Sequence, residues 1–258
     1  MLKSGLVSIS FRKLSVAEIV EMCAKAGLKG IEWGGDVHVP HGDWKAAEAA
    51  KRMTADAGLK VAAYGSYYRA GVSEQAGLSF SEVLDSAVEL EAPTIRVWAG
   101  NKAFAEIEPE EYCAIVEDLL RIGQMAGEQG ITVSLECHGN TLTDTNDSAI
   151  KLKQDLAGSP VCFYWQPPVG TSFEYRLDGL RQMLPVMTNQ HVYHWQPGTK
   201  RCPLAEGTAE WAEYLKLAAS VKGTHYALLE FFRDDSGEQF YEDAATLKKL
   251  IASLNKPE

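Results

Sequence analysis

The sequence predicts an α/β protein that folds as a single (β/α)₈ barrel, the TIM-barrel architecture, over residues 1–258. Eight short apolar segments alternate regularly with helical patterns, and no linker rich in Pro, Gly or Ser separates them. Such alternation is typical of parallel strands joined by crossover helices, and roughly 250 residues is the usual length of a closed barrel of this kind. An open, doubly wound sheet is the alternative, but no GxGxxG motif follows the first strand to support it.

The eight apolar segments have the composition and length of buried strands. They lie at residues 6–10, 30–33, 61–64, 94–98, 131–136, 161–165, 191–195 and 225–232. Helical patterns follow them at residues 15–27, 43–57, 79–91, 109–129, 145–156, 173–184, 207–221 and 238–254. Each strand is therefore followed by one helix, which makes eight repeats of the same unit.

Sequence signals at the helix ends support these assignments. Ser15 and Glu18 have the spacing of a capping box at the start of the first helix. AKAGLKGIEW at 24–33 is echoed by ADAGLKVAAY at 55–64, and in both stretches a glycine stands where a helix ends in a left-handed residue. The echo indicates the same succession of helix, glycine turn and strand in two adjacent units.

Composition limits the kinds of partner. The formal net charge is −10 and the pI is near 5.2, whereas nucleic acid or an anionic membrane surface would require a basic face. We therefore expect a small-molecule substrate, no nucleic acid and no membrane. The first apolar run is too short for a signal peptide and no stretch reaches the roughly 18 residues of a membrane helix, which predicts a cytoplasmic protein. The five cysteines are scattered without a CxxC pair, so neither disulfides nor a cysteine zinc site is expected.

Two glutamates stand out at the ends of predicted strands, where the active site of this barrel lies. Glu136 ends the apolar run of the fifth strand in VSLECH, and Glu230 lies inside ALLEFF in the eighth. An ionised carboxylate in such surroundings costs several kcal/mol unless a positive group compensates it. A divalent metal shared by both glutamates explains the pair. A buried salt bridge to an arginine such as Arg96, or a misplaced strand end, remains the structural alternative.

A histidine on the seventh strand strengthens the metal hypothesis. Strand alternation in HVYHW places His191, Tyr193 and Trp195 on one face and His194 on the other. Carboxylates together with an imidazole make a suitable shell for Mn²⁺, Mg²⁺, Co²⁺ or Zn²⁺. We expect His191 rather than His194 to face the barrel mouth, although the sequence does not fix the register.

With Glu136, His191 and Glu230 on strands five, seven and eight, the chain resembles the xylose isomerase-like TIM-barrel superfamily. This group of sugar isomerases and epimerases also contains DNA-repair enzymes of the endonuclease IV type. The resemblance implies one divalent cation, held by a Glu, an Asp, a His and a Glu from strands five to eight. Gln166 stands where the family has the Asp. A glutamine oxygen can bind a hard cation, but the ligand set then carries a formal charge of −2 instead of −3, so the ion should be held less tightly.

The resemblance also implies a function. It predicts a sugar or sugar-derivative isomerase or epimerase, in which Glu136 and Glu230 move a proton on and off a carbon next to a carbonyl while the metal stabilises the developing negative charge. One alternative is a non-catalytic or metal-free sugar-binding barrel. Another is an endonuclease IV-like hydrolase, which would need more metal-binding histidines and a basic face. A homo-oligomer is also expected, because these barrels commonly associate.

Further residues at or after the strand ends are expected to contact substrate. They are His38, Tyr64, Arg96, Trp98, His138, Trp165, His194 and Arg201. His138 lies two residues beyond Glu136 and should share its side of an extended chain. Each of the others also has a structural explanation, such as core packing for the tryptophans or a solvated loop for His38 and Arg201.

Overall fold

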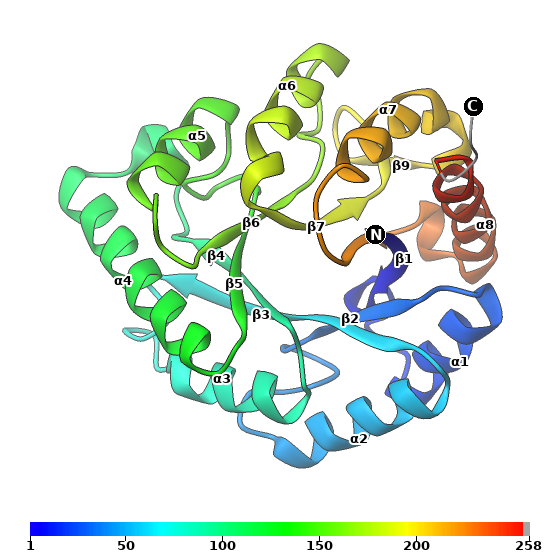
Figure 1. The fold of residues 1–258 in the computed structure, drawn as a ribbon, viewed down its shortest axis with the longest axis horizontal. Coiled ribbons are helices and arrows are strands. Elements are labelled where there is room, and N and C mark those ends of the chain that lie inside the picture. Colours follow the sequence, from blue (N-terminus) through cyan, green and yellow to red (C-terminus); the bar gives the residue numbers. More distant parts are fainter. Residues whose placement is uncertain (255–258) are drawn as a thin grey trace.

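A computed structural model describes residues 1–254 as a closed barrel of eight parallel strands surrounded by helices (Figure 1). The strands lie round the barrel in the order β1-β10-β7-β6-β5-β4-β3-β2, so that each barrel strand is paired with the ones before and after it in the chain. The predicted fold class is confirmed. The predicted domain covers residues 1–258, of which 255–258 lie outside the described residues.

The barrel strands are β1 (Leu2–Val7), β2 (Gly30–Gly34), β3 (Lys60–Ala70), β4 (Thr94–Ala99), β5 (Thr132–Glu136), β6 (Cys162–Trp165), β7 (Met187–Val192) and β10 (His225–Leu229). The α-helices are α1 (Val16–Ala26), α2 (Trp44–Asp56), α3 (Phe80–Glu89), α4 (Pro109–Glu128), α5 (Asn146–Asp155), α6 (Phe173–Met183), α7 (Thr208–Ala218) and α8 (Gly237–Ser253). An antiparallel hairpin of β8 (His194–Gln196) and β9 (Lys200–Cys202) follows β7. Short 3-10 helices lie at Ser8–Phe11, Phe104–Glu106, Leu184–Val186, Leu204–Gly207 and Arg233–Asp235.

The predicted helix-end signals are confirmed. Ser15 and Glu18 form a reciprocal capping box at the start of α1, in which the Ser15 side chain accepts from the Glu18 backbone N–H. Gly27 ends the same helix with φ of 70°, and Gly58 follows α2 with φ of 73°. Left-handed backbone of this kind favours glycine, because glycine has no Cβ to clash with the following carbonyl.

The predicted first strand, 6–10, is wrong by several residues. β1 begins at Leu2 and pairs with β10 from Leu2↔His225 to Leu6↔Leu229, while Ser8–Phe11 coils into a buried 3-10 helix. The stretch LKSG is too polar to be identified as a strand from hydrophobicity, yet parallel pairing fixes it as one. The last predicted strand, 225–232, also ends early, since β10 stops at Leu229.

The predicted seventh strand, 191–195, is displaced as well. β7 runs from Met187 to Val192, and its stretch TNQ, at 188–190, is polar in sequence. Asn189 nevertheless lies buried, where its Nδ2 donates to the Tyr164 hydroxyl at 2.6 Å and its Oδ1 accepts from the Tyr226 backbone N–H at 2.8 Å. The hydrogen-bonding groups of this buried polar side chain are thus satisfied by neighbouring strands. Strand prediction from hydrophobicity does not detect such a residue.

Apolar packing occupies two regions. The larger core lies between the strands and the helices and includes Ala227 and Leu229, while Leu228, between them, belongs to a smaller cluster inside the barrel with Tyr164 and Ala63. This alternation is what a closed barrel imposes on each strand. None of the helices within residues 1–254 has the length and apolar character required to cross a membrane.

Candidate active site

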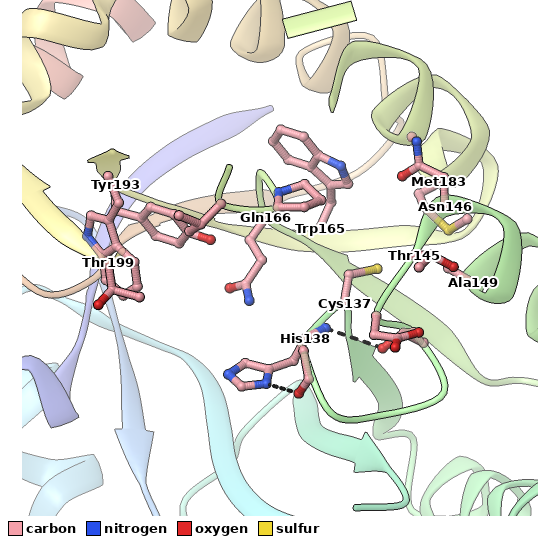
Figure 2. A pocket seen from close by; sticks show the side chains of 17 residues that line it. Cys137, His138, Thr145, Asn146, Ala149, Trp165, Gln166, Met183, Tyr193 and Thr199 are labelled. Atoms are coloured by element: carbon pink, nitrogen blue, oxygen red, sulfur yellow. Dashed lines mark hydrogen bonds between the residues drawn. The ribbon is translucent and has the colours of Figure 1, made fainter. Parts of the chain in front are cut away.

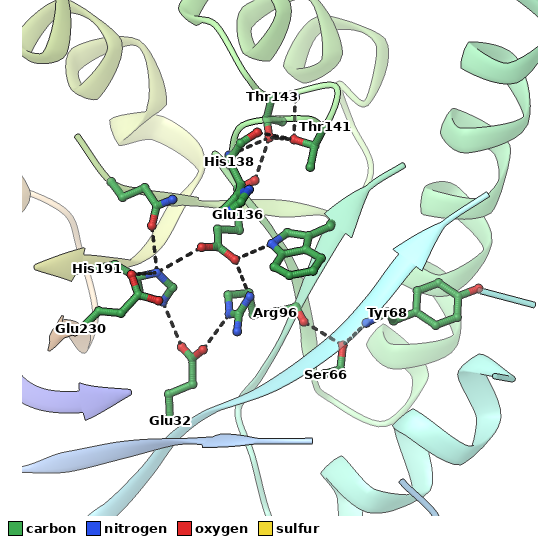
Figure 3. Close-up of polar contacts among 12 residues, drawn as sticks. Glu32, Ser66, Tyr68, Arg96, Glu136, His138, Thr141, Thr143, His191 and Glu230 are labelled. Atoms are coloured by element: carbon green, nitrogen blue, oxygen red, sulfur yellow. Dashed lines mark hydrogen bonds and ion pairs between the residues drawn. The ribbon is translucent and has the colours of Figure 1, made fainter. Parts of the chain in front are cut away.

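Four polar side chains converge at the carboxyl ends of neighbouring strands (Figure 3). The His191 Nδ1 atom lies 3.0 Å from Gln166 Oε1, 3.3 Å from Glu136 Oε1 and 3.6 Å from Glu230 Oε2. Donor atoms of Glu136, His191 and Glu230 all lie within 4.8 Å of one another, and all three residues are buried. The structure therefore brings together all four residues predicted to hold a metal.

The barrel strands position these groups. Glu136 is the last residue of β5, Gln166 follows β6, and Glu230 follows β10. His191 owes its inward direction to an irregularity in β7, where Phe163 pairs with Met187 but Trp165 pairs with Gln190. β7 thus has one residue more than β6 between these pairs, and an extra residue of this kind reverses the face to which later side chains point.

A third carboxylate, which was not predicted as a site residue, lies on the other side of the imidazole. Glu32 of β2 is fully buried, and its Oε2 lies 3.5 Å from His191 Nε2. If Nε2 carries the proton and donates to Glu32, the Nδ1 lone pair faces the three oxygens around it. A carboxylate that orients a metal-binding histidine in this way is a common outer partner. The sequence signal that could have identified it is a glutamate inside the short apolar segment GIEW.

Arg96 of β4 joins two of the carboxylates. Its Nε donates to Glu32 Oε1 at 2.7 Å and its Nη1 donates to Glu136 Oε2. Trp98 Nε1 donates to the same Glu136 oxygen at 2.5 Å. A Cβ at Gly65 would lie 2.8 Å from both Arg96 Nη2 and Glu32 Oε1, so glycine is required for this close approach. The salt bridge considered as the alternative for Glu136 therefore exists, and it coexists with the cluster around His191.

The charges of the cluster set the pKa values. Burial raises the pKa of Glu32 and of Glu136, but the positive charge of Arg96 outweighs it and lowers both below the ordinary glutamate value. Burial raises the pKa of Glu230. Burial lowers the pKa of His191, yet the charges of Glu230 and Glu32 and the contact with Glu136 raise it to about 10. The imidazole is thus held in a strongly negative environment.

These observations fit a divalent cation. Glu32, Glu136 and Glu230 carry three negative charges and Arg96 one positive charge, which leaves −2 while His191 is neutral. A buried excess of two negative charges needs a compensating cation. Carboxylate and amide oxygens with one imidazole nitrogen are ligands that Mn²⁺, Mg²⁺, Co²⁺ and Zn²⁺ accept.

His138 lies at the mouth beside this cluster. Its ring is 5.2 Å from the Trp98 ring, and it is exposed. Its Nδ1 lies 2.7 Å from the Gly139 carbonyl, which only accepts, so Nδ1 must donate. In the neutral ring this leaves the lone pair on Nε2, which makes that atom a potential proton acceptor.

A cavity of about 330 Å³ opens beside the cluster (Figure 2). It reaches from the mouth, where His138, Gln166 and Trp195 line it, to the space between α5 and α6, where Asn146 and Met183 line it. This is within the usual size range of small-molecule sites. The indole N–H of Trp195 is buried and has no hydrogen-bond partner among the described residues.

Other residues predicted to contact substrate have mainly protein partners. His38 is bonded to the Ser8 hydroxyl and the Leu14 carbonyl, and the Tyr64 hydroxyl donates to the Val39 carbonyl while it accepts from His41. Arg96 is enclosed by Glu32 and Glu136, and Arg201 pairs with Asp235. Trp165 packs against Trp211 and Tyr214 but also lines the cavity. His194 packs against Gly207. Their substrate contacts stay predictions.

Comparison with known proteins identifies the family of this chain. Residues 20–256 match the family model described as xylose isomerase-like TIM barrel. The chain belongs to this family. It is 23% identical to 3-dehydroshikimate dehydratase from Bacillus anthracis over 90% of this chain and 91% of that protein.

Two solved structures share the fold. The crystal structure of a probable 3-DHS dehydratase from Bacillus anthracis has a TM-score of 0.80 and 21% identity and covers 95% of this chain and 98% of that one. D-psicose 3-epimerase from Clostridium cellulolyticum H10 has a TM-score of 0.72 and 15% identity and covers 98% and 100%. The named relatives of this xylose isomerase-like barrel are thus enzymes, a dehydratase and an epimerase.

Proposed function

We propose that this chain is a divalent-metal-dependent enzyme that removes a proton from the carbon next to a carbonyl group in a sugar or sugar-derived acid. The observation that carries the proposal is the convergence of Glu136, Gln166 and Glu230 oxygens on His191 Nδ1 at the barrel mouth. An exposed histidine, His138, lies beside it. The small-molecule substrate agrees with the size of the cavity.

Glu136, Gln166, His191 and Glu230 would hold the cation. When bound, Mn²⁺, Mg²⁺, Co²⁺ or Zn²⁺ supplies positive charge where negative charge develops on the carbonyl oxygen. Glu32 orients the imidazole through Nε2, and Arg96 fixes one oxygen of Glu136 so that the other faces His191. These residues position the ligands and exclude water, because all of them are buried.

We assign the proton transfer to His138. Its Nε2 lone pair can take the proton from the carbon, and the C–H electron pair then forms the enolate. Glu136 is a poor proton acceptor, since Arg96 and Trp98 both donate to its Oε2 and its pKa is lowered. In this proposal Glu136 and Glu230 keep their predicted role as metal ligands, and His138 carries out the proton transfer that was predicted for them.

A single free base favours dehydration over epimerisation. In a dehydration, the proton that His138 takes can be passed to the departing hydroxyl group, which leaves as water while the enolate electrons form a carbon–carbon double bond. An epimerisation instead needs one proton carrier on each face of the carbon. The dehydratase name of the Bacillus anthracis relative supports the same choice.

Epimerisation is the second candidate, and one observation favours it. Glu136 ends β5 and Glu230 follows β10, on either side of β7, which carries His191, and burial raises the pKa of Glu230, which makes its carboxylate a better proton acceptor. Glu230 could then exchange a proton on the face opposite His138. The epimerase among the structural neighbours has the same fold.

Incubation with each of Mn²⁺, Mg²⁺, Co²⁺ and Zn²⁺ in deuterated water tests the proposal. The probes are 3-dehydroshikimate and D-fructose, followed by mass spectrometry. Dehydration predicts a product lighter by one water molecule, epimerisation predicts deuterium incorporation without loss of mass, and His138→Gln should abolish either signal. If neither probe changes with any of the four metals, the proposal fails, and the sugar-binding barrel without catalysis becomes the better hypothesis. The cytoplasmic location and the homo-oligomer stay predictions.

A further inference from the structure

One arginine near the mouth has no acidic partner. Three arginines, Arg52, Arg69 and Arg181, form no ion pair with any residue among 1–254. Arg52 and Arg181 are exposed on the outer helices α2 and α6, where water solvates them. Arg69 is only partly exposed and lies near the end of β3, at the active-site end of the barrel.

Neighbouring groups hold Arg69 beside the cluster. Its guanidinium carbon lies 4.2 Å from the centre of the Trp98 ring, and its Nη1 donates to the Gly100 carbonyl at 3.2 Å. Trp98 in turn donates to Glu136 and contacts His138, so one indole ring links Arg69 to a proposed metal ligand and to the proposed base. The Arg69 backbone N–H donates to Ser73 Oγ at 2.8 Å, which fixes the strand end.

The guanidinium has unused hydrogen-bonding capacity. It carries five N–H donors, and the Gly100 carbonyl accepts one of them. Burial lowers the pKa of Arg69, and only the distant charge of Glu136 opposes this effect. A cation that is partly removed from water without a carboxylate partner is costly, unless a ligand supplies the anion.

We propose that Arg69 binds a carboxylate of the substrate, so that the substrate is a hydroxy-carbonyl acid and not a neutral sugar. This inference rests on the proposed function, whose substrate class it narrows. A planar guanidinium matches a carboxylate through two parallel N–H···O bonds.

The surrounding charges favour a carboxylate over a phosphate. Other arginines near the mouth already have partners: Arg96 binds Glu32 and Glu136, Arg12 binds Asp36, and Arg201 binds Asp235. A phosphate group carries about −1.5 to −2 charge and three acceptor oxygens. One free guanidinium balances a single negative charge, which is the charge of a carboxylate.

Calorimetric titration of the Mn²⁺-loaded protein tests the inference with matched ligands. The probes are 3-dehydroshikimate, its neutral methyl ester and D-fructose 6-phosphate. We expect the acid to bind at least tenfold more tightly than the ester. Arg69→Gln should weaken acid binding about 10- to 100-fold and change ester binding less than twofold, and Arg69→Lys should fall between. Arg52→Gln removes the same charge from an exposed helix and should change neither.

Several outcomes would overturn the inference. These are equal binding of acid and ester, equal weakening of both in Arg69→Gln, no saturable binding of the acid, or tighter Arg69-dependent binding of D-fructose 6-phosphate, which would identify a phosphate site. The proposed function fails separately. If the acid binds in an Arg69-dependent manner but is neither dehydrated nor deuterated, the carboxylate site stands and the chemistry is wrong.

Discussion

Replacement of Arg96 by methionine should destabilise the protein strongly. Arg96 is 2% exposed and is the cation that pairs with Glu32 and Glu136, which are 0% and 2% exposed. Methionine retains much of the side-chain volume but removes the charge, so the net charge of the cluster becomes more negative by one. Removing one partner of a buried ion pair costs about 3–5 kcal/mol because the remaining charge is left without compensation.

Urea denaturation followed by circular dichroism measures this loss. A domain of this kind has a free energy of unfolding of about 5–15 kcal/mol, so the expected change is a large fraction of the total. It corresponds to a fall in Tm on the order of 10 °C. Arg52→Met provides the control, because Arg52 is exposed and forms no ion pair within residues 1–254, and its change should stay within about 0.5 kcal/mol.

A second substitution separates the charge effect from a packing effect. Adding Glu32→Gln to the Arg96→Met protein removes one of the uncompensated carboxylates and should recover part of the lost stability. If Arg96→Met lowers the free energy of unfolding by less than about 1 kcal/mol at neutral pH, the carboxylates are not held as buried, ionised partners of Arg96. The charge argument for a bound cation is then wrong.

Three further predictions concern the metal and the proton. His138→Gln should abolish proton exchange on the substrate while Mn²⁺ affinity, measured by calorimetry, changes less than twofold; a loss of metal affinity would instead make His138 a ligand. Gln166→Asp should tighten Mn²⁺ binding about tenfold or more, because it restores a third charged ligand, and unchanged affinity would remove Gln166 from the ligand set. The raised pKa of His191, about 10, means that the metal-free imidazole is protonated at neutral pH, whereas a metal ligand must be neutral. Metal binding should therefore release about one proton per ion and strengthen as pH rises from 6 to about 8, and a pH-independent affinity would contradict this.

Much of the fold could be predicted, since helix periodicity, capping residues and glycine turns act locally. Ser15, Glu18 and Gly27 show this at both ends of α1. The displaced strands, β1 and β7, depend on pairing with strands far away in the chain. Polar residues such as Asn189 are stable in the barrel because partners on β6 and β10 satisfy them, and hydrophobic patterns do not record such partners.

The metal-binding candidates could be predicted because each stands at a strand end in an otherwise apolar segment. Their supporting groups were harder to identify. Glu32 acts on His191 across 159 positions of sequence, and Arg96 was expected to bind substrate although it pairs two carboxylates. The β7 irregularity that turns His191 inward has no sequence marker either. Sequence spacing reports neighbours along the chain, while these roles arise from contacts across the barrel.

Titration of the chelator-treated protein with Mn²⁺ tests the central claim most directly. We predict one ion per chain, and a loss of affinity of about 100-fold or more in Glu136→Gln and in Glu230→Gln, with Glu48→Gln, an exposed residue of α2, as the unaffected control. Binding that does not saturate in the unaltered protein, or equal binding in all three variants, would contradict a cation held by the carboxylates around His191.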